Sequence, residues 1–157
     1  MEELEYIRQA EEIKPRLYRT ALLYLGNEPA AVDAADEAVY KGYLARKKLR
    51  QPELFTTWLT RILINVCNAE LRRLRRETPV EALPETAQEE FDALPLRQAV
   101  EKLPDEVRQV IILRYFSGLT LAETAQALDL PTGTVSTRQR RGLALLRLEL
   151  SDEEGET

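Results

Sequence analysis

Helical periodicity is the feature that most constrains the fold of this 157-residue chain. Apolar residues recur every three to four positions, the alternation typical of strands is rare, and Leu, Ala, Glu and Arg dominate. The segment from about Pro52 to Arg76 shows the pattern clearly, with one apolar stripe formed by Phe55, Leu59, Ile62, Val66 and Ala69. The sequence therefore predicts an all-α protein.

A proline-containing acidic segment divides the chain into two blocks. Residues 78–94 hold five acidic residues and no basic one, and they show little helical periodicity before Gln88. Such a composition predicts a flexible acidic linker. We therefore expect two small helical domains, an N-terminal bundle over 1–77 and a C-terminal domain over 95–150, followed by an acidic tail over 151–157.

Start and stop signals place the helices within each block. In the first block we expect a helix from Leu4 to Leu25 that Pro15 bends or divides, a second from Pro29 to about Leu49, and a third over 52–76. In the second block we expect helices over 96–103, 105–116, 121–128 and 132–150.

The last two predicted helices form a helix-turn-helix. Thr120 and Glu123 have the spacing of a capping box, and the Asp-Leu-Pro turn that follows leads into the final helix. On a helical wheel, Val135, Gln139, Gly142 and Leu146 make its inner face, with Gly142 kept small for close packing. The outer face and its edges carry small and basic residues: Gly133, Ser136, Thr137, Arg138, Arg140 and Arg141.

These outer residues fit major-groove entry, because small side chains allow close approach and arginines reach guanines or phosphates. The alternative is an ordinary solvated helix face. The capping box, the turn and the helical glycine favour DNA contact. The net charge of −5 does not oppose this interpretation, since the acids concentrate in the linker and tail while both helical blocks are slightly basic.

Composition argues against most other classes of protein. The chain has no histidine, the commonest general base and metal ligand, so the sequence predicts neither an enzyme nor a metal or cofactor site. It has a single cysteine, Cys67, which we expect to be buried as an apolar side chain in the core. No segment has the length of a membrane span, and the acidic N-terminus is unlike a secretory signal. We therefore expect a cytoplasmic protein with no membrane insertion of its own.

Residues 103–147, LPDEVRQVIILRYFSGLTLAETAQALDLPTGTVSTRQRRGLALLR, resemble the promoter-reading C-terminal domain of bacterial sigma factors. The segment from Gly26 to Arg73 resembles the domain of the same family that binds core RNA polymerase and reads the minus-10 element. The two-domain size is similar to the extracytoplasmic-function (ECF) group. The resemblance implies a specificity subunit that binds polymerase core, through the β′ clamp helices and the β flap, and directs it to promoter DNA.

The resemblance also implies roles for particular residues. An acidic helix face, Asp33, Asp36 and Glu37, would dock on the β′ clamp helices. Minus-10 DNA would be captured by the basic loop and the helix after it, at Lys47, Lys48, Arg50, Gln51, Asn65, Arg72 and Arg73, with Arg75 and Arg76 extending the basic helix end. For the acidic residues the alternative is an ordinary solvated surface. For the basic loop the alternative is a helix end at which the helix dipole favours positive charge. We expect Trp58 to pack in the core rather than stack on a base.

Several positions depart from the family pattern. Ser136 stands where lysine is usual, Gln139 and Asn68 stand where apolar residues are common, and Ile64 stands where a basic residue is frequent. On the predicted clamp-binding helix, Asp36 replaces a usual glutamine and Val39 a usual phenylalanine. These differences leave the fold unaffected but alter the expected base preference and clamp contact.

Three functions remain open from the sequence. The first is an ECF sigma factor, the second a sigma-like decoy that binds an anti-sigma factor without initiating transcription, and the third a stand-alone repressor, which leaves the first domain without a role. An anti-sigma partner is expected for either of the first two. We also expect the free protein to bind promoters weakly, because the acidic linker and tail disfavour approach to DNA.

Overall fold

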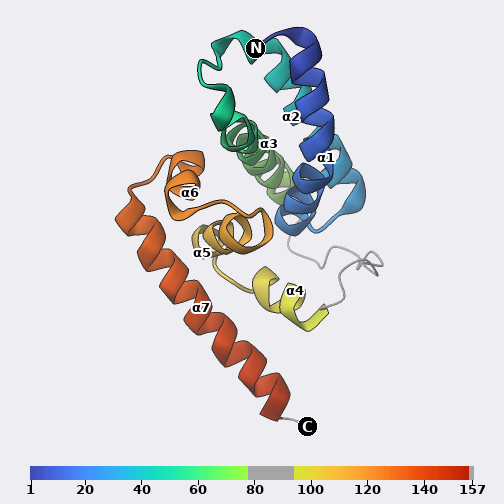
Figure 1. Cartoon of the computed structure of the whole chain (residues 1–157). Coiled ribbons are helices and arrows are strands. Elements are labelled where there is room, and N and C mark those ends of the chain that lie inside the picture. The colour runs from blue at the N-terminus through green and yellow to red at the C-terminus, as the bar shows by residue number, and fades with distance from the viewer. Residues whose placement is uncertain (78–93, 156–157) are drawn as a thin grey trace.

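The computed structural model describes residues 1–77 and 94–155, and every regular element within them is helical (Figure 1). The all-α prediction is confirmed, and the described chain forms two helical parts. The predicted linker lies outside the described residues except for Leu94, as do the last two residues of the predicted tail. The main helices are α1 (Glu3–Leu25), α2 (Glu28–Leu44), α3 (Phe55–Glu77), α4 (Leu94–Glu101), α5 (Asp105–Ile111), α6 (Leu121–Leu128) and α7 (Thr132–Gly155).

The turn between α1 and α2 follows the predicted signals. Gly26 ends α1 with a φ of 66°, a backbone conformation that glycine adopts without strain. The Asn27 side chain then accepts a hydrogen bond from the Ala30 amide at 2.9 Å and caps α2, with Pro29 in its first turn. Pro15 does not divide α1, which runs through it as one helix.

α2 ends at Leu44 instead of near Leu49, and a short 3₁₀ turn over Arg46–Lys48 follows. The Arg46 guanidinium lies 4.2 Å above the Tyr43 ring and donates a hydrogen bond to the Tyr43 carbonyl at 2.9 Å. The Arg46 side chain thus gives a partner to one of the carbonyls at the end of α2. A second 3₁₀ turn, Pro52–Leu54, leads into α3.

The helix predicted over 105–116 changes form at Ile111, where a π-helical turn over Ile112–Phe116 begins. The Ser117 amide donates to the Ile112 carbonyl at 2.9 Å and closes the wider turn. Gly118, with a φ of 74°, then reverses the chain toward α6. At the other end of this part, α7 continues past the predicted end at residue 150 and reaches Gly155, since residues 143–154 contain neither proline nor glycine.

The apolar core of the N-terminal part lies between α1, α2 and α3. Tyr6, Leu22, Leu59 and Leu63 are almost fully buried there. The buried face of α2 consists of small residues, Ala31, Ala34, Ala35, Ala38 and Gly42, which let α1 and α3 approach closely.

The two helical parts are not separate bodies, because the core continues from one into the other. α6 packs against α3, and the π-helical turn packs against α1 (Figure 1). Buried residues of both parts, such as Leu17 and Leu113, belong to one contiguous apolar cluster. The sequence predicted the two parts but gave no indication that they dock on each other.

Candidate nucleic-acid interface

The helix-turn-helix formed by α6 and α7 has the predicted capping box. The Thr120 hydroxyl accepts from the Glu123 amide at 3.1 Å, and the Glu123 carboxylate accepts from the Thr120 amide at 2.8 Å. These contacts lower the pKa of the Glu123 carboxyl, since the amide and hydroxyl groups of Thr120 favour its charged form. Asp129 ends α6 in the left-handed conformation, with a φ of 56°, and starts the turn into α7.

The inner face of α7 also follows the prediction. Val135 is fully buried and Leu146 nearly so. Gly142 lies against α5, where an added β-carbon would sit 2.6 Å from Ile111 Cγ1 and 2.9 Å from Val107 Cγ1. The close helix packing expected at Gly142 is therefore confirmed.

Gln139, the polar residue on this face, is held by Arg114 from the π-helical turn. Arg114 Nε donates to Gln139 Oε1 at 2.7 Å, and Arg114 Nη1 donates to the Leu119 carbonyl at 2.8 Å. One guanidinium thus joins α7 to the loop that precedes α6. Sequence reasoning identified Gln139 as unusual but missed its partner, because the two residues are 25 positions apart.

α7 runs along one edge of the molecule (Figure 1). Gly133, Thr137, Arg140 and Arg141 are exposed, and Ser136 and Arg138 are half-buried. Nothing lies within 4 Å of a β-carbon built on Gly133, so the start of the helix is open to close approach. The Arg141 guanidinium lies 3.8 Å from the Glu106 carboxylate, an exposed pair that weakly offsets its charge. Arg140 and Arg141, with the half-buried Arg138 at their flank, therefore form an exposed cationic ridge on α7.

The basic loop after α2 exposes its predicted residues. All four lie at the surface: Lys47 and Lys48 are in the first 3₁₀ turn, and Arg50 and Gln51 lie between the two turns. Arg46 is different: it turns inward onto Tyr43, while its carbonyl accepts from the N-terminal amine at 3.1 Å. Arg46 therefore shapes the loop, a role that a run of basic residues does not reveal in the sequence.

The basic end of α3 is less uniformly cationic than its sequence suggests. Asn65, Arg72 and Arg76 are exposed. Arg73, however, is paired with both Glu70 and Glu77, and this contact lowers the pKa of the Glu70 carboxyl. Arg75 is paired with Asp105 of α5. Arg72 and Arg76 are thus better placed than Arg73 and Arg75 to meet a phosphate.

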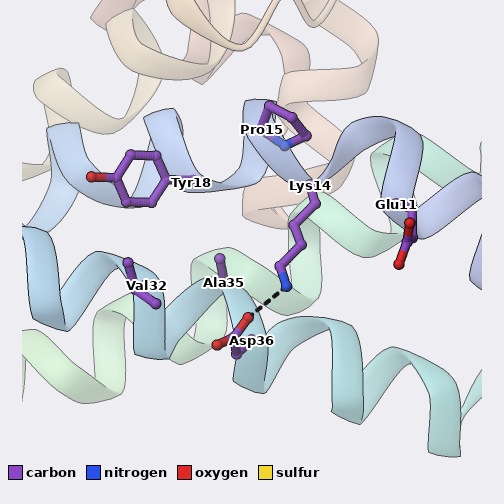
Figure 2. Close-up of a pocket in the computed structure, with 7 residues that line it drawn as sticks. All are labelled: Glu11, Lys14, Pro15, Tyr18, Val32, Ala35 and Asp36. Atoms are coloured by element: carbon purple, nitrogen blue, oxygen red, sulfur yellow. Dashed lines mark ion pairs between the residues drawn. The ribbon is translucent and has the colours of Figure 1, made fainter. Parts of the chain in front are cut away.

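The predicted acidic face of α2 is exposed and lies beside an apolar groove. Asp36 pairs with Lys14 at 2.8 Å, Glu37 pairs with Lys41 at 3.3 Å, and Asp33 is exposed. Figure 2 shows Lys14 reaching from α1 across the groove to Asp36. The groove has a volume of about 470 Å³ and is lined by Glu11, Lys14, Pro15, Tyr18, Val32, Ala35 and Asp36.

Exposed apolar side chains lie on the same helix as this acidic face and on α1, and the sequence analysis missed them. Val32 and Tyr40 are 46% and 62% exposed on α2, and Leu44 at its end is 63% exposed. On α1, Leu4 and Ile7 are also exposed. Large exposed apolar groups gathered with charges are typical of protein-binding surfaces.

Trp58 and Cys67 have the environments expected of them. Trp58 is half-buried and packs against the core, with its ring centroid 6.3 Å from that of Phe55. Cys67 is fully buried, and this burial raises the pKa of its thiol to about 12. Within residues 1–77 and 94–155 no group of carboxylates and cysteine has the arrangement of a metal site. No helix in the described ranges is long and apolar enough to cross a membrane.

The sequence matches two families of the same class of transcription factor. Residues 10–77 match the family described as Sigma-70 region 2, and residues 99–148 match Sigma-70, region 4. These matches and the helix-turn-helix define the class, a bacterial sigma factor with two conserved regions.

Individual relatives specify the group. The chain is 30% identical to RNA polymerase sigma factor SigV of Bacillus subtilis, over 90% of this chain and 88% of that protein. It is 31% identical to ECF RNA polymerase sigma factor SigW of the same species, over 88% and 85% of the two chains. The chain therefore belongs to the ECF RNA polymerase sigma factors, a family of transcription regulators rather than of enzymes.

Two solved structures share the fold. The sigma factor RpoE, solved in complex with the anti-sigma factor NepR from Bartonella quintana, superposes with a TM-score of 0.80 at 21% identity and covers 94% of this chain and 97% of that one. CnrH, solved with the cytosolic domain of CnrY, gives a TM-score of 0.71 at 20% identity and covers 94% and 88%. At this level of identity the likeness concerns the arrangement of helices.

Proposed function

We propose that this chain is an alternative sigma factor that binds core RNA polymerase and directs transcription initiation at specific promoters. The observation that carries the proposal is the outward cationic ridge of α7 in a chain of the ECF family. A sigma factor of this kind contributes recognition rather than catalysis, so the chain needs no cofactor or metal. It acts in the cytoplasm, where promoter DNA and polymerase are found.

Residues 95–150 read the minus-35 element. Gly133 and Thr137 allow α7 to approach the major groove, where Arg140 and Arg141 reach base edges or phosphates. Arg138 lies at the flank of the ridge and contacts the backbone. Ser136 has no positive charge to offer a phosphate, so binding strength depends more on the two exposed arginines.

Residues 1–77 bind polymerase and minus-10 DNA. Asp33, Asp36 and Glu37 dock on the β′ clamp helices, and the exposed Val32 and Tyr40 add apolar contact there.

The basic loop, Lys47, Lys48, Arg50 and Gln51, captures an unpaired minus-10 base. It does so together with Asn65, and Arg72 grips the upstream phosphates. Arg73 also contacts the upstream phosphates once its ion pairs with Glu70 and Glu77 are broken.

An anti-sigma factor is the expected regulatory partner. The sigma factor RpoE was solved in complex with the anti-sigma factor NepR, and this chain presents an acidic, partly apolar α1–α2 surface on which such a partner can compete with polymerase. The decoy hypothesis gives the chain only this interaction. It does not account for an exposed cationic ridge on α7, which a decoy has no need to keep.

In-vitro transcription tests the proposal. Core polymerase and this protein are incubated with a pool of promoter fragments, and the start sites are mapped. We expect discrete start sites that depend on the protein and are lost when Arg140 and Arg141 are both replaced by Ala. Arg19→Ala, an equivalent exposed change on α1, is the matched control and keeps them. Stable core binding without specific start sites would favour the decoy.

A further inference from the structure

The basic loop after α2 is held at its first residue, Arg46. The Arg46 guanidinium lies 4.2 Å from the centre of the Tyr43 ring and donates a hydrogen bond to the Tyr43 carbonyl at 2.9 Å. Both contacts suit a guanidinium, which can place its planar face on an aromatic ring while its N–H groups reach an oxygen. Arg46 is therefore attached at two points to the residue three positions before it.

Tyr43 is itself held from α1. Its hydroxyl donates to the Glu3 carboxylate at 2.8 Å, and its ring meets the Tyr6 ring edge-on, with the ring centroids 6.0 Å apart. Tyr6 is 1% exposed, and its hydroxyl donates to the Val39 carbonyl at 2.6 Å. Arg46 therefore rests on a ring whose position is set by the N-terminal bundle.

A second anchor lies within the loop, at Leu49. This side chain is half-buried and packs against the apolar core, and the Leu49 amide donates to the Arg46 carbonyl at 3.3 Å. The Lys48 amide donates to the Ala45 carbonyl at 2.9 Å. The backbone from Arg46 to Leu49 is therefore closed into a 3₁₀ turn with both of its ends attached to the bundle.

The residues assigned to base capture are carried by these two anchors. All four are exposed, two of them between the anchors and two directly after them: Lys47, Lys48, Arg50 and Gln51. Fixing the backbone of one residue costs about a factor of ten in an equilibrium constant, so a loop that is already fixed spares the complex that cost. How well these side chains discriminate between bases therefore depends on the backbone that carries them.

We propose that Arg46 is a positioning residue for minus-10 recognition: by holding the loop against Tyr43, it determines which base the loop accepts without contacting the DNA itself. The inference rests on the proposed function and deepens it, because it separates the residues that meet the base from the residue that places them. Arg46 belongs to the same basic run as Lys47 and Lys48, but its side chain is half-buried and turned onto the ring.

Arg46→Met is the central variant of the test. Methionine is also long and unbranched, but it has neither the charge nor the donors, so the loop loses both contacts with Tyr43. Transcription is measured with core polymerase on promoter fragments that carry each of the four bases at every minus-10 position. A variant that only folds less well loses activity equally on all of these fragments, so the ratio between bases is the readout.

We expect Arg46→Met to reduce the preference for the best base by about tenfold at one minus-10 position. Preferences within the minus-35 element, which α7 reads, should stay as in the wild type. Arg19→Met makes the same substitution at an exposed position of α1 and should leave both sets of preferences unaltered. An unaltered minus-10 preference in Arg46→Met would overturn the proposal.

Substitutions of Tyr43 distinguish positioning from a simple loss of charge. Tyr43→Phe keeps the ring beneath Arg46 and removes only the hydrogen bond to Glu3, so most of the minus-10 preference should remain. Tyr43→Leu removes the ring and should lower the preference toward that of Arg46→Met. Because the two residues act through one contact, the double variant should lose little more than Arg46→Met alone, and fully additive losses would contradict action through Tyr43.

Hydrogen exchange tests the positioning in the absence of DNA. The amides of Lys48 and Leu49 close the 3₁₀ turn, and they should exchange about tenfold faster in Arg46→Met than in the wild type or in Arg19→Met. Equal exchange in Arg46→Met and the wild type would overturn the proposal. If the wild type gives no promoter-specific start sites, the proposed function fails, whereas this measurement still decides whether Arg46 holds the loop.

Discussion

Replacing Gly142 by alanine tests the packing of the recognition helix most sharply. The new methyl group would lie 2.6 Å from Ile111 Cγ1, 2.7 Å from Ile111 Cδ1 and 2.9 Å from Val107 Cγ1. Overpacking of this kind costs about 1–3 kcal/mol, whereas alanine in place of glycine gains about 1 kcal/mol of helix propensity. The expected result is a net loss of about 1 kcal/mol in the free energy of unfolding.

The same substitution at Gly133 is the matched control. It lies on the same helix, its φ is not positive, and nothing is within 4 Å of the added methyl group. Alanine there should be neutral or stabilising by up to about 1 kcal/mol. Urea unfolding followed by circular dichroism should therefore separate the two variants by about 1–2 kcal/mol.

A further variant locates the cause. In an Ile111→Ala background two of the closest atoms are gone, so Gly142→Ala should cost less than it does in the wild type. If Gly142→Ala were as stable as Gly133→Ala, the argument that the glycine serves close helix packing would be refuted.

Three other predictions follow from the same structure. Thr120→Ala removes the hydroxyl of the capping box and should lower the free energy of unfolding by about 1 kcal/mol in urea titrations; a larger effect of Thr132→Ala, at the start of α7, would contradict this. Burial raises the pKa of the Cys67 thiol from 9.0 to about 12, so the unfolded chain loses this proton first and stability should fall as the pH rises from about 9 to about 12. Cys67 should accordingly react with a thiol reagent only when denaturant is added. Rapid reaction of the native chain would contradict the burial of this thiol. Replacing Arg140 and Arg141 together by alanine should weaken promoter binding by the holoenzyme, measured by fluorescence anisotropy. The slope of log binding constant against log salt concentration should become shallower by about 2, and an unchanged slope would place these arginines away from phosphates.

The sequence predicts those features of the fold that depend on neighbouring residues. The helix starts at Asn27 and Thr120 and the end at Gly26 are fixed by side chains within three or four positions, so local patterns reveal them. The inner face of α7 follows from helical geometry alone. The exposure of its arginines was predictable for the same reason.

Features that depend on distant residues are not visible in the sequence. Thr20 and Ser117 are 97 positions apart, and neither hydroxyl indicates a buried partner. Two sets of local contacts were also missed, because basic residues in a run suggest exposed charge. Arg46 turns onto Tyr43, three positions before it. Arg73 belongs to a basic cluster in the sequence, yet its two acidic neighbours on the helix already engage it.

Site-specific cross-linking in the promoter complex tests most directly the claim that one chain reads two promoter elements. Photoreactive groups at Thr134 on α7 and at Ala69 on α3 lie near the predicted contact residues without replacing them. In a complex with core polymerase and promoter, the account predicts two DNA cross-links separated by about 25 base pairs, or about 85 Å. Cross-links at a single location, or from α7 alone while transcription starts normally, would contradict it.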